Sequence, residues 1–159
     1  MTAPDPSLIE RLHASTTDFD WIAARLLPRQ YERLDEEWSA HEHLFHLLGT
    51  ERHNFQPRLS RMLAEDRPVF EEWDSLGYMT DEYVPEPPLD ELAAQFVAAR
   101  HETLRLFDNL RDEDWARTGV WPAGEVDVAW VAGHVTWHSL DHLAGLLGLY
   151  QDLELRHAP

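Results

Sequence analysis

The sequence has 159 residues, and its 13 basic side chains, all arginine, face 30 acidic ones, which gives a net charge of −17 with histidine neutral. A chain of this length forms one domain, and its 43% apolar residues are enough to bury a core. The negative charge argues against a nucleic-acid partner because the chain repels phosphates. The lack of cysteine excludes metal sites with thiolate ligands, and the lack of lysine excludes Schiff-base chemistry.

The sequence also lacks the marks of a membrane or secreted protein. No stretch approaches roughly 18 uncharged apolar residues, which is about the length that a membrane-spanning helix needs. The first residues show neither the basic nor the apolar region of a secretion signal. We therefore expect a cytoplasmic protein with no membrane partner.

The first half of the chain predicts two helices. Apolar residues at spacings of three and four, stopped by Pro28, predict a helix over about residues 7–27. Ser39 followed by Glu42 has the spelling of a capping box, so a second helix should begin there and end near residue 65. Pro57 should kink this helix because it removes one backbone hydrogen bond.

The second half predicts two more helices and a long connection. Residues 66–88 hold prolines and aromatic residues without a sustained helical period, which predicts a loop that packs over the protein. Helices are predicted over about 89–110 and 128–150, the latter capped by Asp127, and turn residues without strand alternation occupy 111–126. The sequence thus predicts an all-α four-helix bundle, a single domain over residues 1–159, with 66–88 as a crossover.

Histidines mark the candidate functional region. His134, His138 and His142 recur every four residues on the fourth predicted helix, where side chains lie roughly 5–6 Å apart and two imidazoles can bind one metal ion. On the second predicted helix, His46 is the histidine beside Leu47 and Leu48. One ligand from the second helix and two from the fourth would make a three-histidine site with an open position, as in catalytic zinc sites.

Simpler interpretations stand beside this one. A histidine pair four residues apart on a helix is often incidental, and each buried neutral imidazole needs only a hydrogen-bond partner. His41 and His43 lie in the first turn after the cap, and we interpret them as solvated surface groups. Trp130 and Trp137 are interpreted as core or rim packing.

Four segments resemble the DinB-like family of bacterial four-helix bundles. The run from Trp38 to Arg52, Trp-Ser-Ala-His-Glu-His-Leu-Phe-His-Leu-Leu-Gly-Thr-Glu-Arg, resembles the family's signature in the second helix. The run His138-Ser-Leu-Asp-His142-Leu resembles its signature in the fourth helix. Residues 68–74 are similar to the family's crossover loop and residues 96–100 to its third helix, so the resemblance spans about residues 8–150.

This resemblance implies an up-down-down-up bundle that holds a divalent ion, often nickel, zinc or iron, at the mouth of a pocket. It implies His46, His138 and His142 as the ligands. We interpret His134 not as a ligand but as a residue that either orients a ligand or lines the pocket. Characterised relatives include transferases and isomerases that use bacillithiol or mycothiol. Two positions depart from the family: Ser139 stands where many members have an acid, and Gly145 where many have glutamine.

Together these features predict a metal-dependent enzyme of thiol-transferase or hydrolase type that acts on a small molecule. The ion would activate a water or a substrate thiol, and a thiol would have to come from a low-molecular-weight cosubstrate because the chain has no cysteine. Arg100 would either pair with a substrate carboxylate or form a salt bridge to a helix glutamate, while Tyr78 and Trp73 would line the pocket. Because metal-bound histidines must be deprotonated, metal affinity should fall as the pH drops through about 6.5.

The alternative function is a non-catalytic helical bundle that a metal stiffens and that acts through dimerisation or partner binding. Structural metal sites usually have four protein ligands, so a site with three histidines and an open position favours the enzyme. The sequence leaves the ion, the substrate and the formation of a homodimer open.

Overall fold

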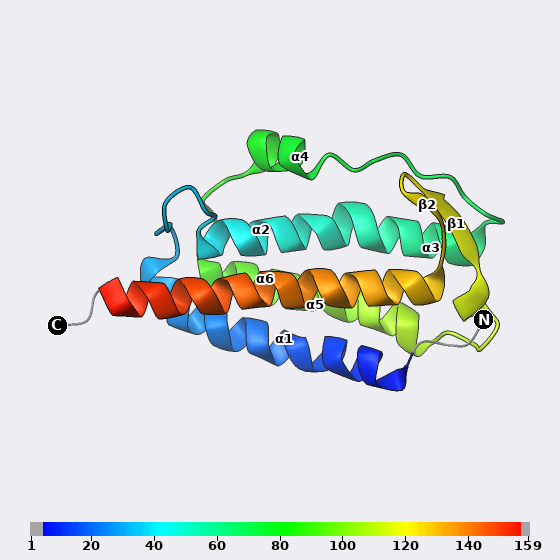
Figure 1. Cartoon of the computed structure of the whole chain (residues 1–159), viewed down its shortest axis with the longest axis horizontal. Helices are drawn as coiled ribbons and strands as arrows, with labels where there is room; N and C mark the ends of the chain where they lie inside the picture. Colours follow the sequence, from blue (N-terminus) through cyan, green and yellow to red (C-terminus); the bar gives the residue numbers. More distant parts are fainter. Residues whose placement is uncertain (1–4, 157–159) are drawn as a thin grey trace.

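The computed structural model describes residues 5–156, which form a four-helix bundle with a small β-hairpin at one end (Figure 1). In Figure 1, helices α1 and α6 run in one direction, while α2, α3 and α5 run in the opposite one. This is the up-down-down-up order, and the all-α bundle prediction is confirmed. The long elements are α1 (Pro6–Leu26), α2 (Ala40–Thr50) continued by α3 (Gln56–Ala64), α5 (Leu89–Asp108) and α6 (Val128–Arg156).

Side-chain caps determine where these helices begin. The Ser39 hydroxyl accepts a hydrogen bond from the backbone N–H of Glu42, and the Glu42 carboxylate accepts one from the N–H of Ser39, so the predicted capping box is present. Asp127 caps α6 by accepting from the N–H of Trp130 at 2.7 Å. These caps satisfy N–H groups that would otherwise lack partners at the helix ends.

The predicted kink near Pro57 takes the form of a π-helical turn. This turn spans Glu51–Phe55 and joins α2 to α3, and the N–H of Gln56 bonds to the carbonyl of Glu51, five residues earlier. Because Pro57 has no N–H, the chain cannot keep the regular α-helical pattern across it. The wider turn inserts a residue and shifts the side chains of α3 around the helix axis relative to those of α2.

The crossover contains a helix that the sequence analysis did not predict. Helix α4 (Ser75–Glu82) begins at Asp74, whose carboxylate accepts from the N–H of Gly77 at 2.8 Å. In Figure 1 the crossover leaves the end of α3 and runs back along the bundle through α4 to the start of α5. The expectation of a loop without helix was wrong because eight residues are too few to show a clear period, and the Asp74 cap stabilises them locally.

The expectation that the 111–126 region lacks strands was also wrong. Strands β1 (Thr118–Trp121) and β2 (Gly124–Asp127) pair antiparallel, and Gly124 takes a φ of 131° at the turn. Each strand has four residues, too short for alternation to be recognised in the sequence. The crossover adds to this hairpin, because the N–H of Phe70 donates to the carbonyl of Val120 at 2.9 Å.

Two apolar clusters fill the bundle, one on either side of a buried polar layer. The first holds residues such as Leu47, Phe96 and Leu146, and the second residues such as Phe55 and Leu104. Between the clusters, four polar side chains are buried on the inner faces of three helices: Glu51, Arg100, Thr103 and Ser139. No helix within the described part of the chain has the length and apolarity to cross a membrane.

Candidate metal centre

The second helix supplies one of the candidate ligands. The capping box fixes the start of α2 directly after Trp38, and His46 follows in its second turn with 6% of its surface exposed. The side chain of Arg33 pairs with Glu42 and so reinforces the same cap. His46 is therefore held on a rigid, well-capped helix and not on a loop.

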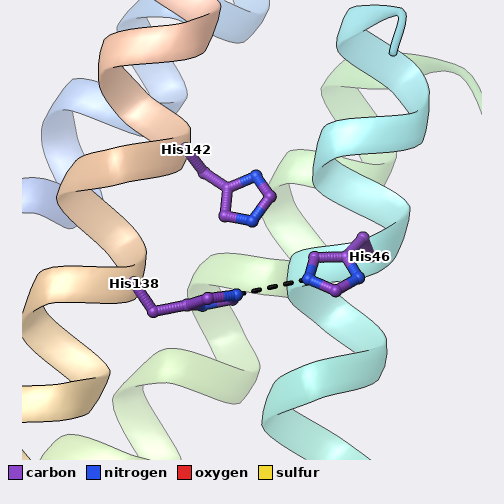
Figure 2. Close-up of side chains that lie close together, drawn as sticks. All are labelled: His46, His138 and His142. Atoms are coloured by element: carbon purple, nitrogen blue, oxygen red, sulfur yellow. Dashed lines mark hydrogen bonds between the residues drawn. The ribbon is translucent and has the colours of Figure 1, made fainter. Parts of the chain in front are cut away.

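Helix α6 brings two further histidines to face His46. Figure 2 shows His138 and His142 extending from α6 toward His46 on α2. Each of the three residues offers a nitrogen atom, and these atoms all lie within 4.8 Å of one another. Nε2 of His46 lies 3.2 Å from Nε2 of His138, and the ring centres of His138 and His142 are 4.6 Å apart. The structure thus brings together the three histidines to which the sequence assigned a metal.

Burial keeps these imidazoles in their neutral form. Loss of solvation lowers the pKa of His46 to about 4, and the nearby His142 adds to the shift. It lowers the pKa of His138 to about 2, with smaller contributions from His142, His46 and Arg100. Burial lowers the pKa of His142 as well. Near neutral pH all three rings are therefore deprotonated, which is the state that binds a metal ion.

Aromatic side chains enclose the three rings. Trp38 stacks on His142 with 6.1 Å between the ring centres, and its centre lies 5.0 Å from that of His46. Trp73, from the crossover, lies 6.0 Å from His46, and Phe55 presents its ring to His138 edge to face at 5.6 Å. These neighbours limit access of water to the imidazoles.

Tyr78, expected from the sequence to line the pocket, lies behind Trp73. Its ring packs on Trp73 at 5.6 Å and on Phe45 at 5.5 Å, and ring contacts to the three histidines are not found among the described residues. It crosses α2 at Gly49, where a Cβ atom would lie 2.3 Å from Cε1 of Tyr78. Gly49 therefore provides the space that lets α4 lie against α2. Tyr78 therefore supports Trp73, which in turn contacts His46.

His134 lies outside the three-histidine group found among the described residues. Its ring stacks on Trp130 at 4.8 Å and lies 5.8 Å from both Trp137 and Phe55. Burial lowers the pKa of His134, and the positive charge of Arg58 lowers it further. It thus continues the line of rings along α6, one turn before His138.

Arg100 has a buried partner within the protein. Its Nε donates to a carboxylate oxygen of Glu51 at 2.8 Å, and its Nη1 donates to the Ser139 hydroxyl at 2.7 Å. The side chains of Arg100 and Glu51 are each 1% exposed. Of the two roles considered for Arg100, the structure supports the salt bridge to a helix glutamate and leaves no exposed donor for a substrate carboxylate.

Comparison with known proteins places the chain in a family. The sequence profile of the DinB superfamily matches residues 11–146. The chain belongs to the DinB superfamily. Its fold is similar to that of YfiT from Bacillus subtilis, described as a probable metal-dependent hydrolase with an unusual four-helix bundle topology. The TM-score is 0.81 at 17% sequence identity, over 92% of this chain and 86% of YfiT. A search of curated proteins finds no match.

The donor set of this DinB-superfamily chain fits a divalent metal ion. Nδ1 of His46 and of His138 is buried without a hydrogen-bond partner among residues 5–156, while the Nε2 atoms of the two rings face each other. These Nε2 atoms lie 3.2 Å apart, so either one of them carries a proton that the other accepts, or both present lone pairs that an ion between them can bind. Imidazole nitrogens suit zinc, nickel and iron, the ions that the family resemblance suggested.

Sequence reasoning misjudged two histidines in the first turn of α2, of which His43 lies beside the metal centre. His41 is fully buried and lies 3.1 Å from the Tyr83 hydroxyl and 2.8 Å from the Pro87 carbonyl, and His43 contacts His142. Their interpretation as solvated surface groups was wrong, because the end of the crossover covers His41 and helix α6 covers His43. Position in a first helical turn carries no signal of such long-range cover.

Proposed function

We propose that this protein is a metal-dependent enzyme of hydrolase or thiol-transferase type that acts on a small molecule. His46, His138 and His142 would hold the ion. The observation that carries the proposal is that three neutral imidazoles from two helices, one buried and two partly buried, offer nitrogen atoms within 4.8 Å of one another. The fold shared with YfiT, itself described as a probable metal-dependent hydrolase, supports it.

The chemistry follows from three protein ligands and an open position. A divalent ion held there supplies Lewis-acid chemistry, polarising a substrate carbonyl or lowering the pKa of water or of a thiol toward neutrality. Trp38 and Trp73 provide apolar walls beside His46 that exclude bulk water and strengthen electrostatic interactions. Because the chain has no cysteine, a thiol nucleophile would have to come from a low-molecular-weight cosubstrate.

The test begins with the metal content of protein purified without a polyhistidine tag. We expect about one zinc, nickel or iron ion per chain in the parent after reconstitution and a large loss in the His142→Ala variant. The matched control is His101→Ala, which removes an exposed imidazole of α5. Equal metal content in the parent and in His142→Ala would contradict the assigned ligands, and no metal in the parent would contradict the proposal.

The reaction type can be tested on the same samples. The metal-loaded parent is mixed with activated esters and with electrophiles such as epoxides, with and without a low-molecular-weight thiol. A rate that requires the thiol indicates a transferase, and a rate that is independent of it indicates a hydrolase. Turnover that persists in the metal-free protein contradicts both.

One observation favours the alternative of a bundle that acts through dimerisation. Trp130, Trp137, Leu140 and Leu147 form a stripe along α6 and are 40–61% exposed. Between residues 130 and 147 the helix carries a single acidic side chain, Asp141, although the chain as a whole has a net charge of −17. Two copies of such an acidic protein repel each other less across a face of low charge than across an acidic one. We therefore propose a second copy of the chain as the occupant of this stripe.

A further inference from the structure

A fourth histidine reaches the metal centre from the turn of α2 that precedes His46. His43 lies three residues before His46 on the helix, and its Nδ1 is 2.8 Å from Nδ1 of His142, a hydrogen-bond distance. The two ring centres are 5.1 Å apart at an interplanar angle of 79°. Trp38 contacts both rings, with its centre 5.7 Å from that of His43. His43 is thus packed against the outer side of the His142 ring.

This contact determines which nitrogen of His142 can bind an ion. Of two neutral imidazole nitrogens at hydrogen-bond distance, one carries the proton and the other accepts it. With Nδ1 of His142 directed at His43, Nε2 is the nitrogen left for the ion. Metal-ligating histidines usually donate their other ring N–H to an oriented acceptor in this way. Of the three candidate ligands in the described chain, His142 is the one whose Nδ1 has a side-chain partner.

Helix α6 leaves room for His43 through a glycine. A Cβ atom at Gly145 would lie 3.3 Å from Cε1 and 3.7 Å from Nε2 of His43, and the first of these distances is tighter than an ordinary van der Waals contact. Gly145 lies three residues after His142, so the ring of His43 rests on the α6 backbone beside its partner. A side chain at position 145 would push the ring away from Nδ1 of His142.

We propose that His43 is a positioning residue of the metal centre. Its Nδ1 accepts the Nδ1–H of His142 and so holds Nε2 of His142 toward His46 and His138, while the missing side chain of Gly145 gives it the space to do so. This inference rests on the proposed function, because it assigns a role to His43 only if the three histidines bind an ion. Loss of an outer hydrogen-bond partner typically lowers metal affinity by about 10- to 100-fold.

The experiment measures zinc affinity by competition with a chelator, using tag-free protein and four variants. We expect His43→Leu to bind zinc about 10- to 100-fold more weakly than the parent. Gly145→Ala should weaken binding in the same direction because its methyl group displaces His43. The matched control is Gly148→Ala on the same helix, where an added Cβ has no neighbour within 4 Å, and its affinity should equal that of the parent.

The fourth variant tests whether the two positions act through one contact. In His43→Leu combined with Gly145→Ala, the glycine change should add no further loss, because the ring that it displaces is already gone. Alanine is also a better helix former than glycine, so we expect Gly145→Ala to raise the unfolding temperature of the metal-free protein while it weakens zinc binding. A general structural defect would lower both quantities.

Two results would overturn the inference without touching the proposed function. One is a parent that binds zinc while His43→Leu binds it within twofold of the parent. The other is a cobalt(II)-substituted parent whose X-ray absorption spectrum requires four imidazole ligands, because His43 would then bind the ion itself. A parent that binds no zinc contradicts the proposed function instead, so the two failures are distinguishable.

Discussion

Replacing Arg100 with leucine should destabilise the protein strongly. The Glu51 carboxylate is 1% exposed and receives hydrogen bonds from the Arg100 guanidinium and from the Thr103 hydroxyl. Without Arg100, a buried negative charge keeps a single hydroxyl donor, and the Ser139 hydroxyl loses a donor as well. Breaking a buried pair in this way costs about 3–5 kcal/mol, a large share of the roughly 5–15 kcal/mol that stabilises an ordinary domain.

The assay is urea denaturation of the metal-free protein, followed by circular dichroism, for the parent and three variants. Arg105→Leu is the matched control, because Arg105 lies on the same helix and pairs with Glu102 while both side chains are 62% exposed. It should cost at most about 1 kcal/mol. The Glu51→Leu/Arg100→Leu double variant should be more stable than Arg100→Leu alone, because it leaves no unpaired buried charge.

Two outcomes would refute this reasoning. One is a loss in Arg100→Leu no larger than that in Arg105→Leu. The other is a double variant no more stable than Arg100→Leu. Either would mean that the buried pair is not what makes Arg100 necessary, and a role in substrate binding would need to be considered again.

Four further predictions concern pH, the crossover and the exposed stripe on α6. Below about pH 6.5 the histidines of the unfolded chain take up protons, whereas His46 in the folded protein, with its pKa near 4, stays neutral. The free energy of unfolding of the metal-free protein should therefore fall between pH 7 and 5, by about 2 kcal/mol from His46 alone. A flat profile in urea denaturation over this range would contradict the burial argument. The same low pKa values should let zinc binding persist below pH 6.5, in contrast to the expectation from the sequence, and a competition titration at pH 5.5 would show it. Gly49→Ala should displace Tyr78 and increase the accessibility of Trp73 to a fluorescence quencher, and unchanged quenching would mean that α4 does not depend on Gly49. Trp137→Glu should convert a dimer to a monomer in light scattering, and a monomeric parent at about 50 μM would refute the proposed pairing.

The four long helices could be predicted from local chemistry, and the family resemblance implied their up-down-down-up order. Apolar spacing, the Ser39 and Asp127 caps and the break before residue 66 are short-range properties, and the structure follows them within a few residues, except that α6 extends to Arg156. The candidate metal centre could be predicted for a related reason. Residues four apart on one helix must share a face, so His138 and His142 point the same way wherever the helix packs.

Features that depend on contacts across the sequence could not be predicted. The sequence left two roles open for Arg100, and the choice depends on Glu51, which is 49 residues away in the chain and is turned inward in the π-helical turn. His41 and His43 looked solvated because the residues that cover them, at 83–87 and 142, come from other elements. Short elements such as α4 and the hairpin carry too few residues for a period to emerge.

The sequence by itself determined the helices and the presence of three histidines on two inward faces, because these follow from periodicity, caps and local spacing, and its family resemblance implied the up-down-down-up order. Only the tertiary structure decided which side chains meet between the helices. The approach of His46 to within 3.2 Å of His138, the burial of Glu51 with Arg100 and the contact of His43 with His142 all depend on how α2, α5 and α6 are positioned against one another. Desolvation of these groups, and hence the neutral state of the imidazoles, arises from that packing, because a pKa depends on everything that surrounds the group.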